Sequence, residues 1–168
     1  MTVADSFKRE EFRAYLMTFL NIPYRWGGAN PLQGLDCGGF VQLGLDYLLI
    51  DPPGDQTADG LLRHFVPRSD QVQTADLGTL LFFGDLGRAP PRATHVAIAL
   101  DRLRVIEAGG GDSSTLTLER AAAQGAYVKV SRIARRRDLI CMLRPHALPW
   151  ALDEAIAALT GRPPDPIR

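Results

Sequence analysis

The feature that most constrains the fold is a change in the spacing of apolar residues partway along the chain. Apolar residues recur at helical spacing over residues 5–20, 37–50 and 57–65. From residue 79 onwards, short apolar runs separated by turn residues replace this pattern, which is typical of β-strands. Helices followed by strands predict an α+β domain, because the two kinds of element then pack as separate layers.

Short strands are predicted throughout the second part of the chain. They cover residues 79–83, 95–100, 104–108, 116–118, 127–132 and 139–144. Short connections favour antiparallel pairing, so we expect a mostly antiparallel sheet of about five or six strands. A last helix is predicted over residues 149–159. The length suits a single domain over residues 1–168, in which about 150–168 form the C-terminal helix and tail.

The chemistry of the chain is concentrated in residues 23–47, which read PYRWGGANPLQGLDCGGFVQLGLDY. Here a Gly-rich loop leads into the second predicted helix, and Cys37 lies in its first turn. The positive end of the helix dipole favours a thiolate over a thiol at this place. Gly38 and Gly39 are poor helix formers, so we expect other segments or a substrate to approach closely there. Cys37 is therefore predicted to be a nucleophile.

A cysteine nucleophile needs an imidazole partner, and the chain has 3 histidines. His64 lies on the third predicted helix and His146 follows the last strand, and both are predicted to be structural. His95 begins the strand HVAIAL, where its side chain can face a cleft while alternate residues turn to the other side. We therefore predict that His95 is the partner of Cys37.

The orienting group for His95 is expected on the next strand. A turn at residues 101–103 folds strand 104–108 back against strand 95–100, which brings Glu107 close to the level of His95. A carboxylate there would accept a hydrogen bond from the imidazole, fix its tautomer and favour its charged form. Considered without Cys37 and His95, Glu107 would be interpreted as an exposed residue at a strand end.

Several of these segments together resemble a known family. PYRWGG, LDCGGFVQ, LGTLLFF, THVAIAL and VIEAGGG occur in the order typical of NlpC-type cell-wall cysteine peptidases, and the resemblance spans about residues 7–145. It implies a papain-like fold, with Cys37 as nucleophile and His95 as catalytic histidine. It also implies that Tyr24 lines the active site and helps to hold substrate and oxyanion. Asp36 matches the residue that pairs with the free amine of a peptide stem in some members.

The sequence departs from the family pattern at two site positions. Glu107 stands where the third polar residue is most often His, and a carboxylate can orient an imidazole equally well. Gly38 stands where Ser is usual, so a substrate-binding hydroxyl is lost while the backbone N–H remains. Asp36 has a second interpretation, as the N-cap of the helix that carries Cys37, and the two roles can coexist.

The resemblance implies a thiol hydrolase that cleaves an amide bond in bacterial peptidoglycan stem peptides, at the γ-D-glutamyl link to a diamino acid. An amidase or acyltransferase of the same fold is one alternative. Another is a catalytically silent binding module of a phage tail or secretion assembly, and a third is a plain α+β domain with a buried structural cysteine. The N-terminus has no Sec-type signal. A standalone form of this kind resembles phage-associated members, so we expect cytoplasmic synthesis and delivery to the wall by other means.

Composition and residue spacing limit the kinds of partner that the chain is predicted to bind. Lys plus Arg and Asp plus Glu number 19 each, for a formal charge of +0, so no global field attracts nucleic acid or anionic lipid. No segment reaches membrane-spanning length, and the cysteines and histidines lack metal-ligand spacing, so no metal or other cofactor is predicted.

Cys141 lies in an apolar run and is predicted to be a buried thiol, unpaired with Cys37. The predicted partner is peptidoglycan or a muropeptide, and oligomeric state is left open. A local basic cluster is expected to be a solvated turn and consists of Arg132, Arg135, Arg136 and Arg137.

Overall fold

The computed structural model of the chain describes residues 3–150, with side chains from residue 6 on. The helices are α1 (Val3–Met17), α2 (Cys37–Tyr47), α3 (Ala58–Phe65) and α4 (Leu118–Gln124), with 3-10 turns η1 (Val66–Arg68) and η2 (Ile133–Arg135). The strands are β1 (Ala29–Asn30), β2 (Gly34–Leu35), β3 (Ser69–Gln71), β4 (Leu80–Asp85), β5 (Arg92–Ala99), β6 (Arg104–Gly109), β7 (Tyr127–Arg132) and β8 (Leu139–Pro145).

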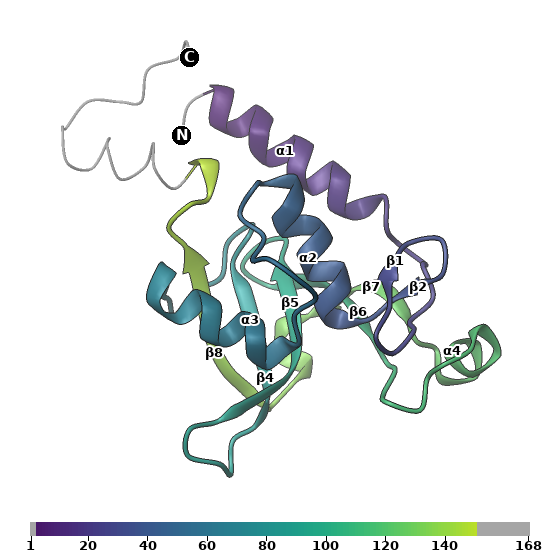
Figure 1. Cartoon of the computed structure of the whole chain (residues 1–168). Coiled ribbons are helices and arrows are strands. Elements are labelled where there is room, and N and C mark those ends of the chain that lie inside the picture. The colour runs from purple at the N-terminus through teal and green to yellow at the C-terminus, as the bar shows by residue number, and fades with distance from the viewer. Residues whose placement is uncertain (1–2, 151–168) are drawn as a thin grey trace.

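Six of the strands form one antiparallel sheet, in the order β3-β8-β4-β5-β6-β7 (Figure 1). The α+β class and the mostly antiparallel sheet predicted from the sequence are confirmed. The strands β4 to β7 follow one another as a meander. The strand β8 returns to pair with β4, and β3 pairs with the other edge of β8. The last strand is therefore internal to the sheet, which the sequence pattern did not indicate.

The main core lies between one face of the sheet and the helices. It includes Phe12 and Leu16 of α1, Phe40 of α2, and Val96 and Ile98 of β5, each 1% exposed or less. Burying a side chain of this size contributes about 1.5–3 kcal/mol. A smaller cluster covers the other face and consists of Ala75, Leu81, Phe83, Ala97, Ala99 and Val105. Residues of β5 thus alternate between the two clusters, as the period-2 pattern predicts.

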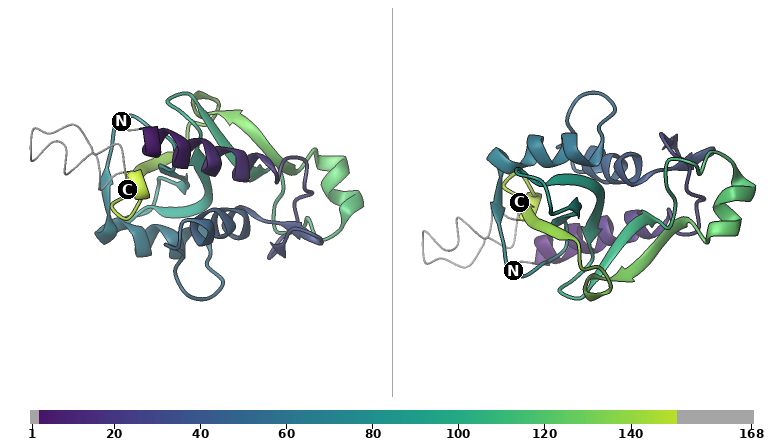
Figure 2. Two further views of the ribbon diagram at one scale, coloured as in Figure 1. Left: turned by 90° about the horizontal axis from the view of Figure 1, so that it is seen from above. Right: turned by 90° about the horizontal axis from the view of Figure 1, so that it is seen from below.

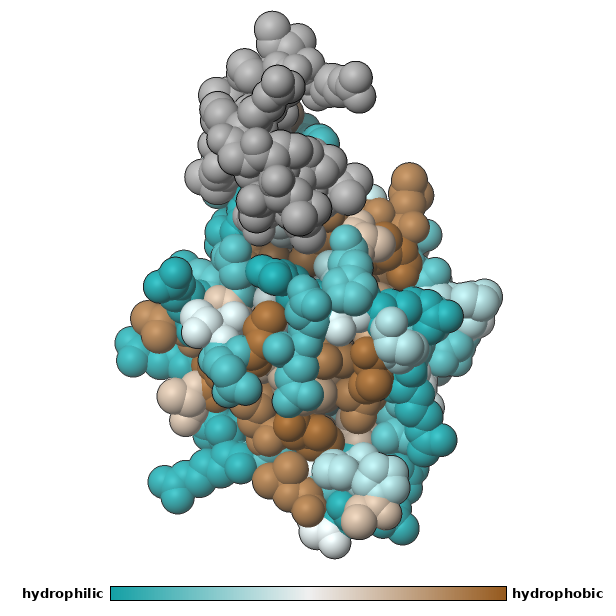
Figure 3. Space-filling model, turned by 90° about the vertical axis from the view of Figure 1, so that its left-hand side faces the viewer, coloured by the Kyte–Doolittle hydropathy of each residue, from teal (hydrophilic) through white to brown (hydrophobic). Residues whose placement is uncertain are grey.

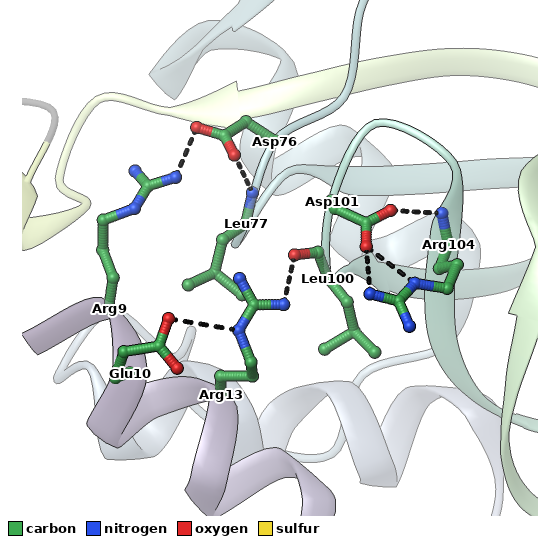
Figure 4. Close-up of polar contacts among 8 residues, drawn as sticks. All are labelled: Arg9, Glu10, Arg13, Asp76, Leu77, Leu100, Asp101 and Arg104. Atoms are coloured by element: carbon green, nitrogen blue, oxygen red, sulfur yellow. Dashed lines mark hydrogen bonds and ion pairs between the residues drawn. The ribbon is translucent and has the colours of Figure 1, made fainter. Parts of the chain in front are cut away.

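Two arginines of α1 tie this helix to the ends of the strands (Figure 4). The Arg9 guanidinium lies 2.5 Å from the carboxylate of Asp76. Arg13 donates to the carbonyl of Leu100 over 2.7 Å. Because Leu100 directly follows β5, the second contact fixes the helix against the strand that carries His95.

Differences from the predicted elements have local causes. The predicted strand at residues 116–118 is wrong, since Thr117 instead caps α4 by accepting from the backbone N–H of Arg120 over 3.3 Å. The helices α1 and α2 end earlier than predicted, at Met17 and Tyr47. Beyond these ends, Asn21 (φ 68°) and Leu49 (φ 60°) adopt left-handed backbone, which does not continue a helix. The polar strand β3 was missed because its residues lack alternating hydrophobicity.

The elements around the Gly-rich loop and the helix α3 lie towards opposite ends of the long axis of the molecule (Figure 2). Figure 2 shows α4 at one end, close to β1 and β2, and α3 towards the other end, with α2 between them. The described residues contain no helix that combines the length and apolar character needed to cross a membrane. The helix predicted over residues 149–159 falls almost wholly outside the described part of the chain, which ends at residue 150.

Candidate active site

Cys37 is the first residue of α2, as the sequence predicts, and Asp36 caps the helix. One carboxylate oxygen of Asp36 accepts from the backbone N–H of Gly39 over 2.8 Å, and the other accepts from that of Gly27 over 3.0 Å. These two bonds join the start of the helix to the Gly-rich loop before it. The Cys37 side chain is 8% exposed, so its sulfur sits at the edge of the core.

His95 and Glu107 meet at the place where β5 and β6 separate. The two strands pair only at Ile98↔Ile106 and Ala99↔Val105. Beyond these pairs, Nε2 of His95 lies 2.6 Å from Oε2 of Glu107, and both residues are buried, at 9% and 6% exposure. The predicted approach of Glu107 to His95 is therefore confirmed, while the catalytic roles of Cys37, His95 and Glu107 stay predictions.

The electrostatics of this pair favour a charged imidazole. Burial alone would favour the neutral ring, but interactions with Cys37 and Glu107 outweigh it and raise the pKa of His95 to about 9. Burial likewise opposes the charge on Glu107, yet the hydrogen bond and the charge of His95 lower the pKa of this carboxyl. The arrangement thus favours an imidazolium and a carboxylate side by side at neutral pH, next to the Cys37 sulfur.

Two residues next to the His95–Glu107 pair, Phe83 and Arg136, were not predicted from the sequence as part of the site. The Arg136 guanidinium lies 4.7 Å from the centre of the Phe83 ring and 2.6 Å from the Asp138 carboxylate. The Phe83 ring centre is in turn 5.9 Å from that of His95. Arg136 also helps to lower the pKa of Glu107. A surface turn was expected here, because nothing local in an Arg-rich turn indicates contact with a distant ring.

Tyr24 belongs to the Gly-rich loop and lies next to the start of β7. Its backbone N–H donates to the carbonyl of Ala126 over 3.0 Å, and its side chain is only 3% exposed. Burial raises the pKa of the Tyr24 phenol, and negative charge at Cys37, Asp36 and Asp112 raises it further. The phenol is therefore a neutral hydrogen-bond donor near Cys37, as its predicted role requires.

The glycine at position 38 has a structural cause. A Cβ on Gly38 would lie 2.5 Å from the backbone carbonyl oxygen of Gln56. Gln42 fixes that loop, since its Oε1 accepts from the N–H of Gln56 and its Nε2 donates to the carbonyl of Gly54, both over 2.8 Å. The loop between α2 and α3 thus occupies the space that a serine side chain would need, so Gly38 is required by the fold of this chain.

A cavity of about 280 Å³ opens beside Cys37. Its walls come from the Gly-rich loop, the start of α2, the loop before α3, and β5. The lining includes Trp26, Asp36, Gly38, Asp55 and Thr94. The predicted substrate-binding residues Asp36 and Gly38 therefore border this cavity together with the predicted nucleophile. Tyr24 is not part of its lining.

The remaining histidines and the second cysteine lie apart from this cavity. His146 pairs with Asp70 of β3 over 3.1 Å, and the His64 ring packs edge-on against Phe65. Cys141 is a free thiol on β8, and burial raises its pKa. Within residues 6–150, no group of three or more His, Cys, Asp or Glu side chains is arranged to hold a metal ion.

Comparison with known proteins gives consistent results. Over 149 residues the chain is 29% identical to murein DD-endopeptidase MepH of Escherichia coli (strain K12), a match that covers 82% of this chain and 53% of MepH. It is 38% identical over 78 residues to the bifunctional muramidase/DL-endopeptidase CwlT of Bacillus subtilis (strain 168), covering 45% of this chain and 22% of CwlT. The chain thus spans about half of one relative and about a fifth of the other.

Solved structures and a family model complete the comparison. The crystal structure of the NlpC/P60 domain of peptidoglycan hydrolase SagA superposes with a TM-score of 0.58 at 25% identity, covering 81% of this chain and 97% of that domain. The model of the NlpC/P60 family matches residues 21–132, a segment that contains Tyr24, Cys37, His95 and Glu107. The chain therefore belongs to the NlpC/P60 family.

Proposed function

We propose that this protein is a cysteine peptidase that hydrolyses an amide bond in peptidoglycan stem peptides. One observation carries the proposal: Cys37 begins a helix beside a buried imidazole whose Nε2 is bonded to Glu107 over 2.6 Å. The names of the relatives MepH and CwlT support the class of substrate. These names refer to DD and DL linkages respectively, and we favour the DL linkage between γ-D-glutamate and a diamino acid.

The mechanism follows from the positions of these groups. The Cys37 sulfur attacks the amide carbonyl. The backbone N–H of Cys37, at the start of the helix where no intrahelical acceptor exists, stabilises the oxyanion together with the Tyr24 hydroxyl. Because Nε2 of His95 is bonded to Glu107, Nδ1 is the nitrogen left to serve Cys37. The imidazolium donates its proton to the leaving amine, which leaves a thioester. Neutral His95 then removes a proton from the water that hydrolyses the thioester.

Asp36 is proposed to bind a free amine of the substrate in addition to capping α2. Burial raises the pKa of Asp36 in spite of hydrogen bonds from Gly39 and Gly27, and the charge of Asp55 adds to the shift. Both carboxylates line the cavity beside Cys37. A cationic amine in this cavity would relieve the repulsion between them, so the site favours a peptide that carries a positive charge near the cleaved bond.

Digestion of purified muropeptides tests the proposed activity and identifies the bond. Monomeric stems and cross-linked dimers are incubated separately with the protein, and the products are read by mass spectrometry. Cleavage of monomers after γ-D-glutamate is the expected result. Cleavage confined to the cross-links of dimers would overturn the proposed bond, and intact substrates in both arms would overturn the peptidase proposal.

The pH dependence of kcat/KM is expected to report the His95–Glu107 pair. His95 must carry a proton to protonate the leaving amine, so the rate should fall as pH rises through about 9. Glu107→Gln removes the carboxylate that favours the imidazolium, which should move this alkaline limb to lower pH and lower kcat/KM about 10-fold or more at neutral pH. Glu119→Gln, on exposed α4, is the control and should keep the wild-type profile. An unchanged limb in Glu107→Gln would contradict the orienting role.

A further inference from the structure

A second cavity, of about 780 Å³, lies next to the one beside Cys37. It is formed by α3 and by the connection between β4 and β5, which extends beyond the sheet at the lower left of Figure 1. Asp59 and Arg92 line both cavities, so the two hollows adjoin. Viewed from the left-hand side of Figure 1, hydrophobic residues form a central surface that hydrophilic residues flank (Figure 3).

The charges of this second cavity are mainly positive. Its lining includes Arg63, Arg88 and Arg92, and Asp59 is its only acidic residue within the described chain. Asp59 is already engaged, because it pairs with Arg63 over 2.7 Å and accepts from the backbone N–H of Ala93 over 3.1 Å. Its charge is therefore largely offset, and its two contacts hold β5 against α3.

Two of the arginines remain available to a ligand. Neither Arg88 nor Arg92 makes a side-chain hydrogen bond or ion pair within residues 6–150. Asp85, which lies opposite Arg92 on β4, accepts instead from the backbone N–H of Gly87 over 2.9 Å. Leu62 and Val66 provide apolar lining on the α3 side. Guanidinium groups beside such a surface can bind a carboxylate through paired N–H donors.

We propose that Arg88 and Arg92 form a subsite for a carboxylate group of the substrate peptide. The inference rests on the proposed peptidase function and extends it. Near Cys37 the groove is acidic, with Asp36 and Asp55, and at the β4–β5 connection it is basic. A peptide with an amine at one end and a free carboxylate at the other matches this charge pattern in one orientation only, so the subsite sets which way the stem lies across Cys37.

Such a carboxylate has three sources in a stem peptide: the α-carboxyl of the γ-linked D-glutamate, the free carboxyl of the diamino acid, and the chain terminus. Four synthetic stem tetrapeptides separate them: one with all three carboxyls free, and three in which the glutamate α-carboxyl, the diamino acid carboxyl or the chain terminus is amidated. Binding is measured by calorimetry with the Cys37→Ala protein, which does not turn the peptide over. Cleavage of the same peptides is measured with the otherwise wild-type protein.

The peptide with all three carboxyls free is expected to bind about 10- to 100-fold more tightly than one of the three amides, since a hydrogen bond to a charged group is worth about 1.5–3 kcal/mol. Whichever amide binds weakly identifies the carboxylate. Adding Arg88→Gln and Arg92→Gln should remove the preference, and in cleavage assays the double variant should raise KM with kcat nearly unchanged. The control is Arg135→Gln, an exposed arginine of η2, which should keep the preference.

Two results would overturn the subsite: equal affinity for all four peptides, or a preference that survives the double variant. Because the binding arm needs no turnover, it decides this question independently of the reaction. A binding preference that depends on Arg88 and Arg92, found together with no cleavage by the wild-type protein, would uphold the subsite and reject the proposed peptidase activity instead.

Discussion

Replacing Cys37 with alanine is expected to abolish muropeptide cleavage, with kcat/KM falling by at least about three orders of magnitude. The variant lacks the atom that attacks the carbonyl, and the buried His95–Glu107 pair cannot form a thioester by itself. The loss should appear in kcat and leave substrate affinity nearly unchanged. Product release followed by mass spectrometry gives the rate, and circular dichroism checks that the fold is kept.

Cys141 offers a matched control for this experiment. It is the only other cysteine of the chain and is a free thiol on β8. Burial raises its pKa, which disfavours the reactive thiolate. Cys141→Ala should keep full activity, and iodoacetamide should label Cys37 well before Cys141. Cleavage that persists in Cys37→Ala would contradict the mechanism. A Cys37 without enhanced reactivity would instead favour the catalytically silent binding module.

The parts of the site that the sequence predicts depend on local patterns. Cys37 begins α2 because Asp36 supplies a side-chain cap immediately before it. Glu107 reaches His95 because the turn before Arg104 is short, so strand register is set by nearby residues. Period-2 alternation also places Val96 in the main core, opposite the face of His95. In each case the information lies within about a dozen residues of sequence.

The parts that the sequence did not predict depend on contacts between distant segments. Arg136, just before β8, reaches Phe83 on the neighbouring strand β4, and the carbonyl of Gln56 covers Gly38. The pairing of β8 with β4 likewise follows from packing of the whole sheet. The helix α4 is a different case, since Thr117 and Gly125 are a local start and stop signal, whereas a strand was predicted over residues 116–118.

Gly39→Ala is expected to destabilise the protein by about 2–3 kcal/mol, although alanine is by itself the better helix former. A Cβ at this position would lie 2.3 Å from the carbonyl oxygen of Gly28 and 3.0 Å from Cα of Ala29. Both are backbone atoms, and the Gly28 carbonyl also accepts from the N–H of Asp36 over 2.9 Å. Relief of the clash therefore requires the Gly-rich loop to leave α2. Urea unfolding measures the loss, which corresponds to a fall in Tm of about 5–10 °C.

Gly60→Ala in α3 is the matched control, because Gly60 holds the same helical position and its backbone N–H likewise donates to the cap residue, here to Oγ1 of Thr57 over 3.1 Å. Its Cβ would meet the end of the Gln56 side chain at 2.7 Å, and a side-chain terminus can turn away. Stability should stay level or rise by up to about 1 kcal/mol. Equal effects of the two substitutions would show that the Gly28 backbone yields easily. A loss confined to Gly39→Ala, accompanied by lower activity, would show that close contact between loop and helix holds Cys37 in place.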